Sequence, residues 1–279
     1  MLIGGFSEEN GWEDSASRLD ELDARTGLWK PLAPMKTRRA FGHTATVVHL
    51  GGRKDSDEVV VVCGGEDENP FNMLSSCELY HPHENRWWHL PDMKVRRCGA
   101  AAAALPDGRL FVFGGGREGN ENSVEFCRLN NWSKLRGPVA SSFWHQALPM
   151  SWCNQWRRYE HAAVAFHNRI FVAGGWPDER EVQIFCPPAY EDYNASGQWT
   201  RLMLPEHQMN SQRSGLCLLV HKNRLFALGG DGWNSVEEFL PEEAKKEASK
   251  EDDFTSWHWL EQTAPASIDL IMAATVIGS

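Results

Sequence analysis

Short apolar runs that end in a pair of glycines recur along the whole chain. They are Leu2-Ile3-Gly4-Gly5, Val60-Val61-Val62-Cys63-Gly64-Gly65, Phe111-Val112-Phe113-Gly114-Gly115, Phe171-Val172-Ala173-Gly174-Gly175 and Phe226-Ala227-Leu228-Gly229-Gly230. Their first glycines are 60, 50, 60 and 55 residues apart. Each run predicts a buried strand, and each glycine pair predicts a point where the backbone turns with positive φ or packs closely.

Two further patterns keep the same order within each interval. Trp-x-x-Leu follows the glycine pairs at Trp29/Leu32, Trp87/Leu90, Trp132/Leu135, Trp199/Leu202 and Trp257/Leu260. Arginine followed by a small or apolar stretch precedes four of the pairs, at Arg38-Arg39, Arg96-Arg97, Arg157-Arg158 and Arg213. Three patterns in fixed order are typical of a repeat architecture.

Each repeat divides into four expected strands, which we name a to d. Strand a is small and apolar (100–105, 161–166, 216–220), and strand b is the run before the glycine pair. Strand c alternates apolar and polar residues (76–80, 182–185, 235–239), and strand d carries Trp-x-x-Leu. Small residues suit a crowded inner strand, and tryptophan suits an outer strand where neighbouring sheets diverge.

With these motifs the sequence resembles the kelch-repeat family over essentially all 279 residues. The resemblance implies an all-β fold, a β-propeller of four-stranded blades around a central channel. We expect one domain over 1–279 with five blades, centred on 4–5, 64–65, 114–115, 174–175 and 229–230. Residues 268–276 resemble a strand a and would close the ring with the N-terminal strand b, although no arginine precedes them. A fragment of a six-bladed propeller is the alternative.

Composition excludes several classes of protein. The net charge is −10, from 28 Lys+Arg against 38 Asp+Glu, which argues against a nucleic-acid binder. No apolar run approaches the 18 residues of a membrane span, and no secretory signal is visible. Seven cysteines without a Cys-x-x-Cys pair predict reduced thiols in a cytoplasmic or nuclear protein. The oligomeric state stays open.

One face of such a propeller collects the b–c and d–a loops, and we predict that it binds a partner. It would carry four arginines, Arg39, Arg97, Arg158 and Arg213, and six aromatic residues, Trp12, Phe71, Trp144, Trp152, Trp176 and Trp233. Guanidinium groups bind carboxylate or phosphate, so the expected partner is a protein or a short acidic or phosphorylated peptide. The alternative is that the arginines pair with acidic neighbours structurally. The long, aromatic segment 136–156 is expected to be either a binding loop or a structural cover.

No catalytic residue, metal ligand or cofactor is predicted. His43 and His161 both fall at the start of a strand a, but two histidines without a third ligand are poor evidence of a metal site. The resemblance implies an interaction module, often the substrate-recognition part of a ubiquitin ligase whose BTB or F-box segment would lie elsewhere in a longer chain. The alternative is a sugar- or small-molecule-acting enzyme, an oxidase or isomerase, at the channel mouth.

Overall fold

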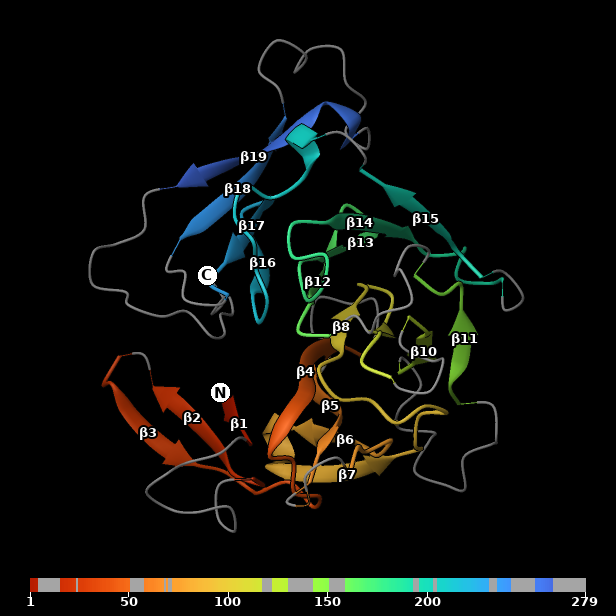
Figure 1. Ribbon diagram of the computed structural model, residues 1–279. Helices are drawn as coiled ribbons and strands as arrows, with labels where there is room; N and C mark the ends of the chain where they lie inside the picture. The colour runs from red at the N-terminus through yellow and green to blue at the C-terminus, as the bar shows by residue number, and fades with distance from the viewer. Residues whose placement is uncertain are drawn as a thin grey trace. The chain divides into compact units, whose positions relative to one another are not determined.

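The computed structural model confirms the predicted all-β class, and its described residues form five antiparallel sheets, the number of blades expected (Figure 1). It describes residues 1–4, 16–23, 25–50, 58–67, 69, 72–116, 122–129, 143–150, 159–192, 196–202, 205–230, 235–241 and 254–262. The chain forms two compact units, Met1–Ala147 and Leu148–Ser279. That these units make up one domain stays a prediction.

The first unit holds three antiparallel sheets. In chain order their strands are β1 (Leu2–Ile3), β2 (Leu19–Asp23) and β3 (Leu28–Pro31); β4 (Phe41–His49), β5 (Glu58–Glu66), β6 (Cys77–His81) and β7 (Arg86–Leu90); and β8 (Ala101–Ala104), β9 (Arg109–Phe113), β10 (Val124–Arg128) and β11 (His145–Ala147). A short 3₁₀ turn, η1 (Pro82–Glu84), joins β6 to β7.

The second unit holds two four-stranded sheets. Their strands are β12 (Ala162–Phe166), β13 (Arg169–Ala173), β14 (Val182–Cys186) and β15 (Gln198–Arg201); and β16 (Cys217–His221), β17 (Arg224–Leu228), β18 (Val236–Pro241) and β19 (Trp257–Gln262). Two 3₁₀ turns, η3 (Pro205–His207) and η5 (Phe254–Ser256), precede β16 and β19.

The expected strands a, b and c are present within one or two residues, except that β5 continues three residues past the expected end at Cys63. Strand d of the third blade is elsewhere. Its outermost strand is β11, paired with β10, and not the predicted segment around Trp132 and Leu135. The motif itself lies outside the described residues. In the N-terminal sheet β1 pairs with β2, as a strand b should pair with a strand c. The closing strand expected at 268–276 also lies outside the described residues.

The cores lie between neighbouring blades of the same unit. In the first unit, apolar residues of β5 and β6 pack with those of β9 and β10, and the alanines of β8 allow the close approach. In the second unit the aromatic side chains Phe166, Phe171, Phe239 and Phe254 form the centre of the equivalent cluster. Burial of these faces is the main stabilising contribution to a fold whose sheets are each too small to stand alone.

The glycine pairs mark the places where the next linker crosses the end of strand b. Gly64 has φ +65°, and a Cβ there would lie 2.5 Å from the carbonyl oxygen of Arg97. In the second unit a Cβ on Gly174 would lie 2.5 Å from the carbonyl oxygen of Arg213. The second glycine of each pair donates its N–H to that same oxygen, Gly65 at 2.7 Å and Gly175 at 2.8 Å. Only glycine satisfies both the positive φ and the close contact.

Candidate functional site

The d–a linker of each blade meets the b–c loop of the preceding blade in the same unit. The N–H of Arg97 donates to the carbonyl of Leu74 at 3.0 Å, and the N–H of Arg213 donates to the carbonyl of Glu179 at 3.0 Å. The two kinds of loop therefore share one end of each blade, as the strand order predicts. The d–a linkers and b–c loops are the segments on which the sequence analysis predicted partner binding.

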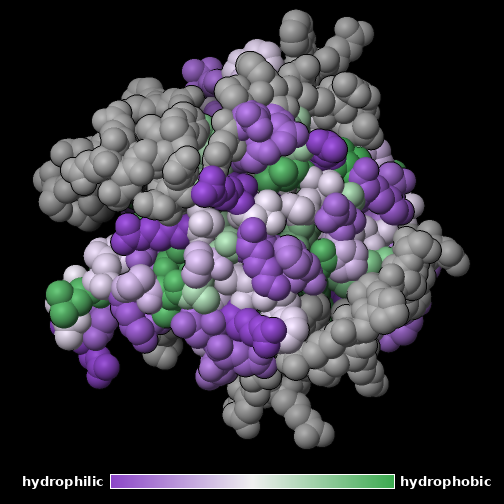
Figure 2. All heavy atoms as spheres, turned by 90° about the horizontal axis from the view of Figure 1, so that it is seen from below, coloured by the Kyte–Doolittle hydropathy of each residue, from purple (hydrophilic) through white to green (hydrophobic). Residues whose placement is uncertain are grey.

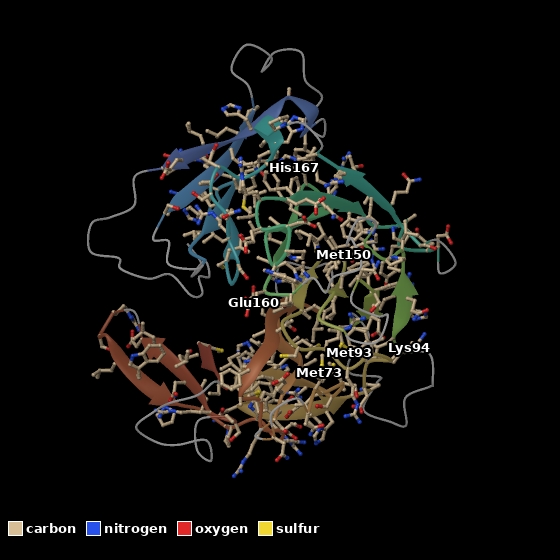
Figure 3. The ribbon with its side chains drawn as sticks, in the orientation of Figure 1. Met73, Met93, Lys94, Met150, Glu160 and His167 are labelled. Atoms are coloured by element: carbon tan, nitrogen blue, oxygen red, sulfur yellow. The ribbon has the colours of Figure 1, made fainter. Side chains whose placement is uncertain are left out.

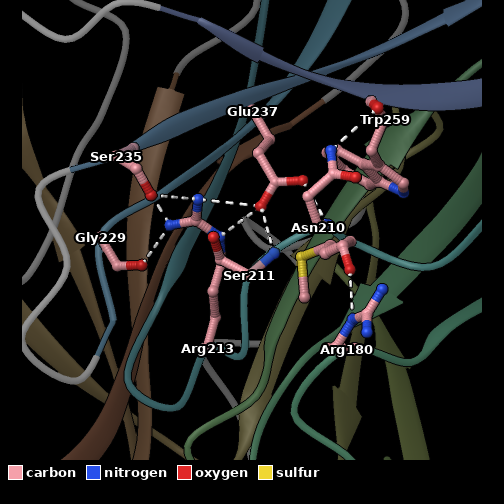
Figure 4. Close-up of polar contacts among 9 residues, drawn as sticks. Arg180, Asn210, Ser211, Arg213, Gly229, Ser235, Glu237 and Trp259 are labelled. Carbon is pink, nitrogen blue, oxygen red and sulfur yellow. Dashed lines mark hydrogen bonds and ion pairs between the residues drawn. The ribbon is translucent and has the colours of Figure 1, made fainter.

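A buried arginine anchors each of three described linkers. Nη1 of Arg97 donates to the carbonyl oxygens of Gly114 (2.5 Å) and Ser123 (3.0 Å). Its Nη2 donates to the hydroxyl of Ser123 (2.9 Å) and to Oε1 of Glu125 (2.9 Å). Arg39 makes the same set with Gly64, Ser76 and Glu78, and Arg213 makes it with Gly229, Ser235 and Glu237 (Figure 4).

The paired glutamate completes this anchor, which we call the arginine clamp. Glu125 accepts the backbone N–H groups of Lys94 (2.8 Å) and Val95 (3.1 Å), so its carboxylate holds the linker as well as the guanidinium. Glu78 and Glu237 accept two linker N–H groups in the same way. Burial lowers the pKa of Arg97, and the adjacent Glu125 opposes that shift by favouring the cation.

Three of the four arginines proposed from the sequence are thus members of clamps. Arg39, Arg97 and Arg213 have no exposed surface, so a partner cannot reach their guanidinium groups in this structure. Arg158 lies outside the described residues. These three arginines instead pair with buried glutamates, which is the structural alternative given in the sequence analysis.

The residue before each clamp arginine of the first unit is, by contrast, exposed. Arg38 and Arg96 are both exposed, and Nη1 of Arg96 makes long hydrogen bonds to Asn72 Oδ1 (3.4 Å) and the Met73 carbonyl (3.3 Å) of the b–c loop. In the second unit the corresponding position before Arg213 is Gln212. The sequence analysis did not select Arg38 and Arg96 as binding residues, although the sequence held a signal. The second arginine of the pair is present in four repeats, as expected of a structural residue, whereas the first is replaced by Gln212 in one of them.

Trp144 is a structural residue and not an exposed one. It is 2% exposed, and its Nε1 donates to the carbonyl of Pro91 at 2.8 Å. Trp87 and Trp199 make the equivalent bond to the linker before their own blade, to Ala33 (2.6 Å) and Leu148 (2.9 Å). Trp144 therefore takes the architectural role that the sequence analysis gave to Trp132, and this part of the segment 136–156 is an edge of the blade.

Trp176 is the proposed aromatic residue that the structure leaves accessible. It is 38% exposed and stacks on Tyr159, with ring centroids 5.8 Å apart and planes at 29°. An isolated bridge joins the two residues, and the Trp176–Pro177 peptide bond is cis. The remaining proposed aromatic residues, Trp12, Phe71, Trp152 and Trp233, lie outside the described residues.

Several ionisable groups of the described residues are buried. No group of three His, Cys, Asp or Glu there could hold a metal ion. Burial, with a smaller effect of the Arg39 charge, lowers the pKa of His43 to about 4, while a hydrogen bond to the Ile3 carbonyl opposes the shift. The imidazole is therefore neutral near pH 7. The carboxylates of the clamps accept hydrogen bonds from the guanidinium groups and from backbone N–H groups.

The six described cysteines are free thiols. Cys63, Cys77 and Cys127 are buried, and burial raises the pKa of Cys77 and of Cys127. A thiol whose pKa is raised carries little thiolate, so these side chains act as small core residues.

The face drawn in Figure 2 is mostly hydrophilic, with hydrophobic residues in small separate areas. Of the helices that the described residues form, none has the length and apolar character needed to cross a bilayer.

Comparison with known proteins matches this chain to kelch-like and F-box/kelch-repeat proteins. The chain is 29% identical over 235 residues to kelch-like protein 36 of Rattus norvegicus, a match that covers 84% of this chain and 34% of the relative. It is 27% identical over 223 residues to kelch-like protein 35 of Mus musculus, and 30% identical over 112 residues to an F-box/kelch-repeat protein of Arabidopsis thaliana. No protein-family profile matches it.

The repeat, the five sheets and these relatives together show that the chain is similar to kelch-repeat proteins. The fold and the kelch-like relatives support a protein-interaction domain. The chain spans about a third of the length of the kelch-like proteins it matches, since 34% of each is covered.

Proposed function

We propose that this propeller binds a segment of a partner protein through its d–a and b–c loops, and that Arg38 and Arg96 recognise acidic or phosphorylated side chains of that segment. The observation that carries the proposal is that the two arginines of each pair differ in exposure. Arg39 and Arg97 are buried and fix the loop, while Arg38 and Arg96 are exposed on it.

Two properties of these loops suit recognition. The clamps hold the linkers by several charge-assisted hydrogen bonds, so little conformational entropy is lost when a partner binds. The linkers of neighbouring blades also converge, because the N–H of Gly99 donates to the carbonyl of Gly42 at 2.9 Å. Guanidinium groups on two converging loops suit a segment with carboxylates or phosphates at more than one position.

We further propose that this binding selects substrates for a ubiquitin ligase. An F-box/kelch-repeat protein among the relatives and the 34% coverage of the kelch-like proteins support a propeller that works with a segment outside the matched region. The free thiols support a reducing compartment, the cytoplasm or the nucleus.

Affinity capture with quantitative mass spectrometry tests the proposal. The protein is compared with an Arg38→Gln/Arg96→Gln double variant and with Arg25→Gln as the control. Arg25 lies in the turn between β2 and β3, and its side chain is 95% exposed. The proposal requires a partner that the double variant loses and the control keeps. A synthetic acidic segment of that partner must then bind with affinity reduced at least tenfold in the double variant.

A partner bound equally by all three proteins would overturn the role of Arg38 and Arg96. Because both side chains are exposed, neither substitution is expected to change folding, and melting temperatures within a degree or so of one another would confirm that.

A further inference from the structure

Glu160 occupies a position of the repeat at which three other blades have glycine. The position lies two residues before β12, and its counterparts are Gly99 before β8, Gly215 before β16 and Gly42 at the start of β4. These glycines have φ of 66°, 69° and 61°, and Glu160 adopts φ 59°. The φ angle is thus similar at all four positions, but only one of the four residues carries a side chain. Glu160 is labelled in Figure 3.

A left-handed conformation is unfavourable for a residue with a Cβ, and glutamate has no particular tendency to adopt it. Glycine at 160 would be conformationally easier, as its three counterparts show. Residues held in unfavourable backbone regions cluster at functional sites, where the side chain compensates for the cost. Glu160 is exposed, so its compensation is not burial in the core.

Two partly exposed aromatic residues, Tyr159 and Trp176, lie beside the backbone of Glu160. Tyr159 precedes it and is 36% exposed, and Tyr159 pairs with Trp176 through a 3.2 Å hydrogen bond from the Trp176 N–H to the Tyr159 carbonyl. The d–a linker and the b–c loop of this blade thus bring two π faces and a carboxylate onto adjacent backbone. At the equivalent places of the next blade in this unit the linker has Ser214 and Gly215.

The carboxylate of Glu160 is held in place by the linker of the next blade. The hydroxyl of Ser214 donates to Oε2 of Glu160 at 2.7 Å, and the N–H of Gly215 donates to its carbonyl at 2.8 Å. The b–c loop adds Asp178 and Glu179. Its cation, Arg180, donates from Nε to the carbonyl of Met209 at 2.7 Å.

We propose that Tyr159, Glu160 and Trp176 form a subsite for one basic side chain, an arginine or lysine of a bound protein segment. A cation over an aromatic face is attracted by the ring quadrupole, and a fixed carboxylate adds a charge-assisted hydrogen bond. The subsite is of opposite charge to that proposed for Arg38 and Arg96. It rests on the proposed function only in that both require a protein segment as ligand.

Selection from a random peptide library displayed on phage tests this subsite. The baits are the unchanged protein, Glu160→Gln, Glu160→Gly and, as a matched control, Glu191→Gln, an exposed glutamate in the c–d loop of the same blade. We expect the unchanged protein and the control to enrich peptides with a recurrent arginine or lysine. Replacing that residue by norleucine, or using Glu160→Gln, should weaken binding at least tenfold in fluorescence anisotropy.

Glu160→Gly separates recognition from folding. It installs the residue of the other blades, so its melting temperature should equal or exceed that of the unchanged protein while basic peptides are lost. Enriched peptides without a conserved cation, or affinity unchanged in both Glu160 variants, would overturn the subsite and leave the proposed function standing. A library that enriches nothing on the unchanged protein counts against both the subsite and the proposed function.

Discussion

Nη2 of Arg97 lies 2.9 Å from Oε1 of Glu125, and neither side chain has any exposed surface. The pair joins the linker before β8 to strand β10 of the same blade. Arg39 with Glu78, and Arg213 with Glu237, repeat it at 3.1 Å and 3.0 Å. A buried ion pair of this kind is costly to break, because each charge depends on the other for its solvation.

Arg97→Ala should therefore destabilise the protein severely. It leaves the carboxylate of Glu125 buried beside backbone donors alone, and we expect a loss of about 3–5 kcal/mol in the free energy of unfolding. Denaturant unfolding followed by circular dichroism measures it. Arg96→Ala, one residue away and exposed, should change the value by no more than about 0.5 kcal/mol. Equal stability of the two variants would contradict the clamp.

Gly64→Ala should be much more harmful than Gly27→Ala, although both glycines have positive φ. A Cβ added at Gly27 would meet no atom within 4 Å, so its substitution should cost only the conformational penalty, about 1 kcal/mol. At Gly64 the added methyl meets the Arg97 carbonyl at 2.5 Å, which should cost about 1–3 kcal/mol more. Comparable melting temperatures for the two variants would show that the linker does not pass so closely.

Trp144 and Trp29 offer a similar contrast among the tryptophans. Trp144→Ala removes a buried ring and its bond to Pro91, and we expect a loss of about 3–5 kcal/mol in the free energy of unfolding. Trp29 is 54% exposed on β3, so Trp29→Ala should cost no more than about 1 kcal/mol. If Trp144 belonged to an exposed binding loop instead, the first substitution would leave the denaturation midpoint unchanged.

Acidification should destabilise the fold through His43. Its pKa is about 4 in the folded protein against an ordinary 6.5, so the unfolded chain binds more protons between these values. Stability contributed by the neutral imidazole is present above pH 6.5 and lost as the pH falls towards 4, by roughly 3 kcal/mol at most.

His43→Gln provides the comparison for this pH dependence. It retains an N–H donor for the Ile3 carbonyl but does not titrate. Unfolding free energies measured from about pH 7 to pH 4 should fall less steeply in the variant than in the unchanged protein. Parallel pH profiles would assign the acid sensitivity to other groups.

Much of the architecture follows from the sequence alone because its patterns are local and repeated. Strand length and burial follow from apolar runs such as 60–63, and the close linker crossing follows from the glycine pairs. The all-β class, the five blades and most strand boundaries to within one or two residues needed no tertiary information. The third blade was the exception, because two tryptophans, Trp132 and Trp144, competed for one role and only the pairing of β10 with β11 distinguishes them.

The candidate site depended far more on the tertiary structure. In the pairs Arg38-Arg39 and Arg96-Arg97 the residue type is the same, yet one guanidinium is exposed and its neighbour is buried. That outcome is decided by Glu78 and Glu125, carboxylates about 30 to 40 positions away in the chain that only folding brings near. Likewise the sequence contains Glu160 among many acidic residues, and only its positive φ and the adjacent stacked rings distinguish it. Local patterns determine strands because their physics is local; exposure and pairing are properties of contacts between distant segments.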